Sequence, residues 1–171
     1  EKVSLDLATF YNDYDHLRSV EYGPFVPGAV NTETAILGNT LEGQTYGAEL
    51  SGNYHVTDGW RIKTGYTFLK VQLHKKPGSL DLSTEASEGN DPENQFFLQS
   101  SVDLPRNVQL DTTLRYVDVL SALHVQSYLV GDVRVAWEPI KSLEIALIAQ
   151  NLLDNQHAEF SSILENEVEQ S

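Results

Sequence analysis

Histidine and cysteine are the side chains that most often bind transition metals, and this chain offers few combinations of them. Its 171 residues include five histidines and no cysteine. The histidines are His16, His55, His74, His124 and His157. No two of them have the spacing that brings two ligands to one face of a helix, and no thiolate is present to complete a tetrahedral site. We therefore expect no metal site.

Motifs for nucleophilic catalysis and phosphate binding are also missing from the sequence. No GxSxG elbow occurs, which would expose a catalytic serine at a turn between a strand and a helix. The segment GQTYG contains Gly43 and Gly47, but it lies inside a strand-like stretch. Glycine in a strand permits twist or the close approach of a neighbouring chain. We expect neither enzymatic activity nor a cofactor.

Charged side chains alternate with apolar ones in several segments, so they share the polar faces of predicted strands. They are Glu49, Arg61, Lys63, Asp111, Arg115, Asp132, Arg134 and Glu144. Such groups can form a solvated, salt-bridged wall, or they can contact a substrate directly. A second group of carboxylates lies in the acidic segment Ser79 to Asp91, which has no basic residue. That segment is either a solvated loop or a place where a cationic ligand or divalent ions bind.

The overall composition excludes some classes of partner. The net charge of −14 argues against nucleic acid, because phosphate binding requires an excess of Lys and Arg. Hydrophobic residues make up 40% of the chain, too many for a disordered protein. No stretch approaches the roughly 18 apolar residues of a transmembrane helix, but a membrane-spanning strand needs only about 9–11 residues that alternate.

Alternation of apolar and polar residues predicts about eight strands. The clearest pair is Tyr46–Val56 and Trp60–Phe68, joined by the tight turn Thr57-Asp58-Gly59. The other predicted strands are Val3–Tyr11, His16–Tyr22, Gln95–Leu104, Val108–Tyr116, Leu129–Trp137 and Leu143–Ala149. Polar turn-forming residues separate the first two at Asn12–Asp15. After Phe68 the apolar set changes phase, which indicates either a bulge or a strand end that leaves its buried environment.

The lengths of the connections alternate along the chain. Short turns are predicted after the first, third, fifth and seventh strands, at Asn12–Asp15, Thr57–Gly59, Pro105–Asn107 and Glu138–Ser142. The other connections are longer or less regular. Outer-membrane barrels alternate short periplasmic turns with long outer loops, whereas a soluble sandwich has no reason to do so. The pattern therefore predicts an all-β fold, an antiparallel up-and-down transmembrane β-barrel.

Aromatic side chains lie near the ends of predicted strands. Tyr11, Trp60, Phe96 and Trp137 occupy such positions. Aromatic girdles of membrane barrels lie at the two membrane interfaces, so these residues are candidates for the girdles. The general preference of strands for aromatic residues is the other explanation.

Several motifs together point to a known family. The last predicted strand is followed by NLLDN, a turn signal on its own. Four segments resemble the last strands of TonB-dependent receptors: YNDYDHLRS (11–19), GNTLEGQTYGAELSGNYHVTDGWRIKTGYTFL (38–69), DLPRNVQLDTTLRYVD (103–118) and AWEPIKSLEIALIAQNLLDNQHAEF (136–160). The residues that match the family's structural signatures are Tyr46, Gly47, Asn151, Leu152, Leu153, Asp154 and Asn155.

The resemblance implies a fold and a function. The family's fold is a barrel of about 22 strands, filled by an N-terminal plug. Its members lie in the bacterial outer membrane, in contact with lipid. They import scarce nutrients such as siderophore-bound iron, cobalamin or sugars, with energy delivered by the TonB protein. The partners implied are lipid, the protein's own plug, the TonB complex and a small-molecule ligand.

The resemblance also divides the chain. Residues 1–160 would be barrel strands, and residues 161–171 would be a loop leading to a missing closing strand. The plug and roughly the first fourteen of the 22 strands would precede this segment. The alternative is an autonomous eight-stranded β-barrel, either a small membrane barrel or a soluble lipocalin-like protein that binds a small ligand.

Overall fold

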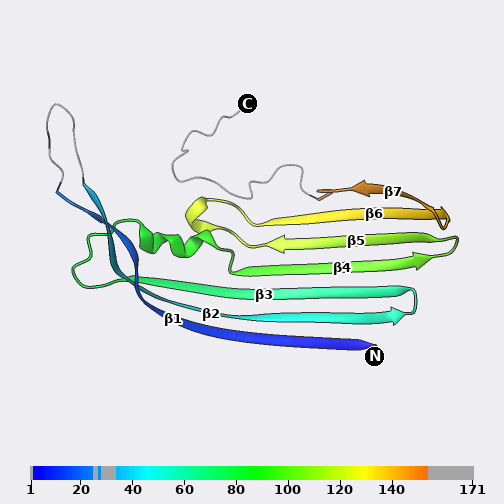
Figure 1. Ribbon diagram of the computed structural model, residues 1–171, viewed down its shortest axis with the longest axis horizontal. Coiled ribbons are helices and arrows are strands. Elements are labelled where there is room, and N and C mark those ends of the chain that lie inside the picture. The colour runs from blue at the N-terminus through cyan, green and yellow to red at the C-terminus, as the bar shows by residue number, and fades with distance from the viewer. Residues whose placement is uncertain (1, 25–26, 28–33, 154–171) are drawn as a thin grey trace.

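The computed structural model describes residues 2–24, 27 and 34–153, and its strands form one antiparallel sheet (Figure 1). The sheet has seven strands in chain order, so each inner strand pairs with the strands before and after it. The strands are β1 (Val3–Tyr22), β2 (Ala35–Thr57), β3 (Trp60–Lys75), β4 (Asn94–Leu104), β5 (Val108–Val117), β6 (Tyr128–Ile140) and β7 (Leu143–Ala149). Two short 3-10 helices, η1 (Thr84–Asn90) and η2 (Ser121–Leu123), lie in the connections. The predicted all-β, up-and-down antiparallel fold is confirmed.

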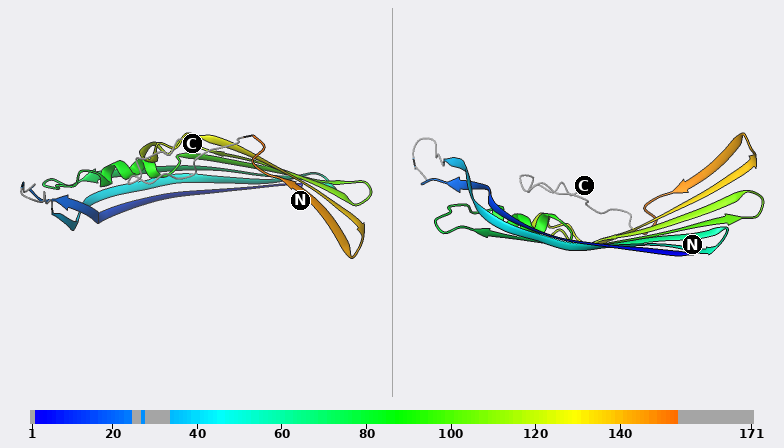
Figure 2. Two further views of the ribbon diagram at one scale, coloured as in Figure 1. Left: turned by 90° about the horizontal axis from the view of Figure 1, so that it is seen from above. Right: turned by 60° about the horizontal axis from the view of Figure 1, so that its bottom comes forward.

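The sheet is a single twisted and curved layer (Figure 2). β1 and β7 lie at its two edges, and in the described part of the chain they do not meet. Among the described residues, no helix has the length and the apolar composition needed to span a bilayer.

The turn predicted at Asn12–Asp15 is wrong. β1 runs through these residues without reversing, and Asn12 pairs with Thr45 of β2. The turn-forming residues instead produce irregularities, because the register shifts between Tyr14 and Leu17 and again before Ser19. His16 has a φ of 58°, a left-handed conformation that a bulge can accommodate. The two predicted strands are therefore one, and the described residues contain seven strands rather than about eight.

The alternation of connection lengths persists after this correction. The tight connections are 58–59, 105–107 and 141–142, and they lie at the same end of the sheet as the N-terminus (Figure 1). The long connections 76–93 and 118–127 lie at the opposite end, where β1 ends and β2 begins. In the second tight turn, Arg106 and Asn107 have φ values of 66° and 58°, which let the chain reverse within three residues.

The change of phase after Phe68 is not a bulge. The register between β2 and β3 is unbroken from the pair Leu41–Lys75 to the pair His55–Arg61. β3 extends beyond the start of β4, because Phe68 is opposite Asn94, the first residue of β4. The apolar set therefore changes where the strand continues past its neighbour, as the second explanation from the sequence requires.

Pairing register puts side chains of one kind on one face. One row on the apolar face crosses six strands and consists of Leu7, Leu50, Tyr66, Phe96, Tyr116 and Leu129. The face is not covered by protein in the described structure, since Leu5, Leu7 and Leu147 are 73%, 68% and 75% exposed. Among the residues that the structure describes, the buried apolar cluster lies in the long connection after β5 and consists of Leu120, Leu123 and Val125. Most of the apolar surface of the sheet is therefore exposed in this chain, as expected of a surface that contacts lipid or another protein.

Candidate functional site

The polar face of the sheet gathers the charged residues selected from the sequence. All eight have the same orientation in the alternation, opposite to that of the apolar row. Asp111 is directly opposite Arg134, and Arg61 is opposite Ser101, which in turn pairs with Asp111. The tertiary structure therefore brings charged residues from five strands, β2, β3, β5, β6 and β7, onto one face of the sheet, which we call the polar wall.

Arg134 joins three strands of the polar wall. Its guanidinium donates to Asp111 Oδ2 at 3.1 Å and to Gln109 Oε1 at 3.2 Å, both on β5. The same group donates to Glu144 Oε1 on β7 at 2.5 Å. Charge-assisted bonds of this geometry fix the orientation of all partners. This centre supports the interpretation of the charged residues as a salt-bridged wall.

Two other ion pairs extend the polar wall. Arg115 of β5 contacts Asp132 of β6 at 3.3 Å, and Asp132 also accepts a hydrogen bond from the backbone N–H of Asn151 at 3.1 Å. Arg61 of β3 lies 3.6 Å from Asp103 of β4. Each pair links neighbouring strands, so the charges bind one another across the sheet.

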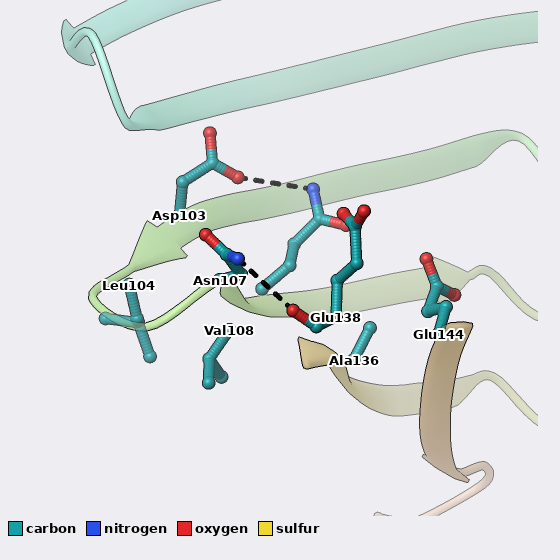
Figure 3. Close-up of a pocket in the computed structure, with 8 residues that line it drawn as sticks. Asp103, Leu104, Asn107, Val108, Ala136, Glu138 and Glu144 are labelled. Atoms are coloured by element: carbon teal, nitrogen blue, oxygen red, sulfur yellow. Dashed lines mark hydrogen bonds between the residues drawn. The ribbon is translucent and has the colours of Figure 1, made fainter. Parts of the chain in front are cut away.

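A polar hollow of about 360 Å³ lies on the wall near the tight turns (Figure 3). Its lining includes the carboxylates of Asp103, Glu138 and Glu144. Gln109 donates to Asp103 Oδ1 at 3.4 Å, and the Asn107 side chain donates to the Glu138 carbonyl at 3.2 Å. The hollow is therefore part of the same hydrogen-bonded wall. In the described residues, no group of three or more His, Asp or Glu side chains is arranged to hold a metal ion.

The four aromatic residues proposed as girdles all lie on the apolar face, but Tyr11 lies in the middle of β1 and not near a strand end as predicted. Trp60 is at the tight-turn end of β3, and Phe68, on the same face, is eight residues further along. At about 3.3 Å per residue this is roughly 26 Å of strand, comparable to the apolar band of an outer-membrane barrel. The Trp60 indole donates to Ser100 Oγ at 3.0 Å, and the Tyr66 hydroxyl donates to Asn94 Oδ1 at 2.7 Å. The rings of Trp60 and Tyr66 are apolar, and their polar groups are hydrogen-bonded, which suits side chains at a membrane interface.

The signature residues Tyr46 and Gly47 lie in the middle of β2. Tyr46 faces Phe68 with ring centroids 6.4 Å apart. A Cβ on Gly47 would overlap the carbonyl oxygen of Phe68 and would lie 2.7 Å from Phe10 Cζ. Glycine is therefore needed where the Phe10 ring crosses β2, as the close approach inferred from the sequence requires.

The described part of the NLLDN segment, residues 151–153, follows β7 and stays beside β6. Asn151 has a φ of 55°, a conformation that asparagine tolerates better than most residues. The Leu152 N–H donates to the Gly131 carbonyl at 2.9 Å, and a Cβ on Gly131 would lie 2.9 Å from Leu153 Cδ1. Asp154, Asn155 and His157 lie outside the described residues, as does the predicted division at residue 160.

The acidic segment Ser79–Asp91 binds the chain itself. Asp81 is 1% exposed and accepts four hydrogen bonds, two of them from Thr84. Burial alone would raise the pKa of this carboxyl, but the hydrogen bonds from Thr84, Val20 and Ser83 outweigh it and lower the pKa to about 2. Glu88 accepts a hydrogen bond from the backbone N–H of Leu73. Asp81 and Glu88 therefore accept hydrogen bonds from backbone N–H groups that have no neighbouring strand as a partner, at the end of β1 and at the end of β3 respectively.

Sequence reasoning missed the partners of this segment on β1 and β2. Ser19 is fully buried, and its hydroxyl donates to Glu21 Oε1 at 2.6 Å. Thr40 and Ser79 donate to the same carboxylate. Hydrogen bonds from Ser19, Thr40, Leu80 and Ser79 lower the pKa of Glu21. The signal in the sequence was weak, because single polar residues at strand ends are common and the acidic segment lies 39 to 61 residues along the chain from these partners.

Comparison with known proteins gives the fold a family context. A family model described as TonB-dependent receptor-like β-barrel matches residues 1–152. The siderophore receptor PiuA from Acinetobacter baumannii is similar with a TM-score of 0.68 and 22% identity, over 91% of this chain and 22% of its own. For the FrpB iron transporter from Neisseria meningitidis the TM-score is 0.66 and the identity 15%, over 88% of this chain and 24% of its own.

A third solved structure agrees. The ferric-catecholate import receptor Fiu from E. coli gives a TM-score of 0.61 with 20% identity, over 91% of this chain and 22% of its own. At these identities the likeness shows a common fold. The chain spans between 22% and 24% of the length of the three structures.

Proposed function

The chain belongs to the TonB-dependent receptor-like β-barrel family, and we propose that it forms seven consecutive wall strands of a receptor that imports a scarce nutrient. The family is one of outer-membrane receptors and transporters rather than of enzymes, and it places the sheet in the bacterial outer membrane. Because the chain covers at most 24% of its solved relatives, the parent protein would supply the remaining strands, the plug and the contact with TonB.

The observation that carries this proposal is the separation of the two faces of an open sheet. One face is apolar, exposed and bordered by aromatic residues, as a surface in contact with lipid must be. The other face carries the ion pairs of Arg134, Arg115 and Arg61, which suit a water-filled lumen or the surface of a plug. The part played by this segment is therefore to form the wall that separates lipid from the transport path.

Iron chelates are the substrate class that we propose first. The solved structures similar to this chain are named as a siderophore receptor, an iron transporter and a ferric-catecholate import receptor. Cobalamin and sugars remain the other classes of nutrient expected of the family. The segment itself would shape the lumen, while the energy of transport would enter through the plug.

The test is uptake by the full-length protein in cells grown without available iron. We expect deletion of its gene to reduce the accumulation of radioactive iron supplied as a siderophore complex, and we expect the same loss when TonB is removed. A plasmid copy of the gene should restore uptake only where TonB is present. Uptake that continues undiminished without TonB would contradict the proposed function.

The alternative of an autonomous eight-stranded barrel receives no support from the geometry. In the described part of the chain, β1 and β7 are at opposite edges and neither has a second neighbour. Unpaired backbone groups at these edges are costly in lipid, so the edges require strands of the parent protein.

A further inference from the structure

The outer end of β1 has a partner on the side facing away from β2. The Gly23 N–H donates to the Thr34 carbonyl, toward β2, at 2.8 Å. Since neighbouring N–H groups of a strand point to opposite sides, those of Val20 and Tyr22 point to the free edge. There the Val20 N–H donates to Asp81 Oδ2 at 2.5 Å, and the Tyr22 N–H donates to the Leu80 carbonyl at 3.5 Å.

The connection between β3 and β4 reaches this edge by crossing the outer ends of β2 and β1. Lys76 N–H donates to the Thr40 carbonyl of β2 at 2.8 Å, and Thr40 Oγ1 lies 2.7 Å from Ser79 Oγ. Beyond it, Leu80 N–H donates to Glu21, and Asp81 is bridged to Glu21 as in an antiparallel pair. Figure 1 shows the segment after β3 passing the ends of β1 and β2. We call residues 76–93 the strap.

The strap is also held at its far end. A Cβ on Gly89 would overlap the Ser121 hydroxyl and lie 2.7 Å from the backbone nitrogen of Ala122, so η1 and the connection after β5 are in close contact. Glu88 accepts from Leu73 N–H, and Leu69 N–H donates to the Glu93 carbonyl at 2.9 Å. The strap thus takes strand-like hydrogen bonds from β1 at one end and from β3 at the other.

A backbone N–H that already donates to the strap cannot also pair with a further strand. Before Val20, the free edge of β1 has no strand beside it among the described residues. We propose that, in the full barrel, the preceding strand pairs with β1 only over residues before Val20, and that the strap closes the edge at Val20–Tyr22. This proposal rests on the proposed function, because it assumes a parent barrel that continues beyond β1.

The strap covers backbone groups of β1 that would otherwise be left without a partner. Outer-membrane barrels are closed, and an edge left open above the membrane is a site for unwanted pairing. Leu80 and Asp81 cover that edge with residues of the chain itself. A loop held in this way at both ends covers the free edge of β1.

Hydrogen exchange on the full-length protein tests the proposal. In the variant Asp81→Ala we expect the amides of Val20 and Tyr22 to exchange at least about tenfold faster, because their protection comes from the strap. Amides of Leu5–Leu7 should be unaffected. Asp91→Ala, at an exposed position of the same strap, is the matched control and should change nothing. Undiminished protection of the Val20 amide in Asp81→Ala would show that this N–H has a partner other than Asp81, and would overturn the proposal.

A cross-link provides a second test if Asp81→Ala lowers the yield of folded protein. Tyr22 and Leu80 form the neighbouring pair of the same antiparallel bridge, since the Tyr22 N–H donates to the Leu80 carbonyl. The pair Tyr22→Cys and Leu80→Cys should therefore form a disulfide on oxidation, and it leaves the carboxylates of Glu21 and Asp81 in place. The pair Tyr22→Cys and Asp91→Cys should not. Failure of the first pair to cross-link in folded protein would refute the strap. Both tests are independent of transport, so iron uptake measured in parallel distinguishes a wrong strap from a wrong function.

Discussion

At the residue scale, the structure assigns functions to small or isolated side chains that carry no catalytic chemistry. Gly47 lets the Phe10 ring cross β2, and Asp81 gives a buried carboxylate to backbone N–H groups of β1 and of its own turn. Both residues act through steric fit and hydrogen bonding. Substitution at either position should therefore lower the free energy of unfolding more than it lowers the rate of uptake by the folded protein.

Replacement of Gly47 by alanine should destabilise the folded protein by about 1–3 kcal/mol, because the new Cβ overlaps a carbonyl and crowds an aromatic ring. The measurement is the urea midpoint of the full-length protein in detergent. Gly65→Ala is the control, since its Cβ would lie 3.5 Å from Phe97 Cδ1, an ordinary contact on the same polar face. Equal midpoints for the two variants would disprove the close-approach explanation.

Asp81 should make stability depend on pH in a defined window. Its pKa is lowered from 3.8 to about 2 in the folded protein, so its contribution is complete above about pH 4 and is lost as the pH falls toward 2. At 1.36 kcal/mol per unit, the contribution is at most about 2 kcal/mol. Asp81→Asn should therefore reduce the unfolding free energy at pH 7, and the difference from the native protein should shrink below pH 4. A difference that is the same at pH 7 and pH 2.5 would refute this linkage.

At the element scale, strands are joined by register and by ion pairs on the polar wall. The neighbours β5, β6 and β7 are joined by Arg134, whose partners are Asp111, Gln109 and Glu144. The pair of Arg61 with Asp103 is longer and more exposed. Exposed ion pairs contribute little to stability, whereas the loss of one member of a half-buried network leaves other charges without a partner.

Arg134→Met should therefore cost about 1–3 kcal/mol, and Arg61→Met, which removes a similar side chain, should cost about 0–1 kcal/mol. Urea denaturation followed by tryptophan fluorescence measures both. The double variant Arg134→Met with Asp111→Asn should recover part of the loss, because the carboxylate left without its partner is removed. Losses of equal size for Arg134 and Arg61 would argue against a central role for Arg134.

At the scale of the whole molecule, the chain is a curved sheet with two different faces and two open edges. Its apolar face has no protein cover in the described structure, and its polar face bears the ion pairs. Such a sheet is stable only where one face meets lipid and the edges meet further strands. This explains why so little of the sheet is buried within the chain itself.

Adjacent residues of β5 should therefore report opposite environments. This chain has no native cysteine, so Leu114→Cys and Thr113→Cys can each carry a single fluorescent label in a full-length protein whose cysteines outside this chain have been replaced by serine. In vesicles of brominated lipid, we expect quenching of the label at position 114 and little quenching at 113, because the two side chains lie on opposite faces. Similar quenching at both positions would contradict the orientation of the sheet.

The sequence by itself determined the strands, their two faces and the alternating connections. These features are local, because side chains alternate with a period of two and turn residues act on their own backbone. The charged residues of the polar wall and the aromatic residues of the apolar face could be assigned to a face for the same reason. The motifs around Tyr46 and Asn151 added the family, which the match to residues 1–152 confirms.

Only the tertiary structure decided how distant segments meet. The residues Asn12–Asp15 favour a turn locally, but a continuous partner, β2, keeps them in one long strand and reduces the turn to a bulge. The register of β5, β6 and β7 decides which carboxylates lie within reach of Arg134. Asp81 binds the backbone of Val20, which is 61 residues away in the sequence. Pairing between strands depends on the fit of two segments rather than on the preference of either, which is why local patterns predicted the strands but not these contacts.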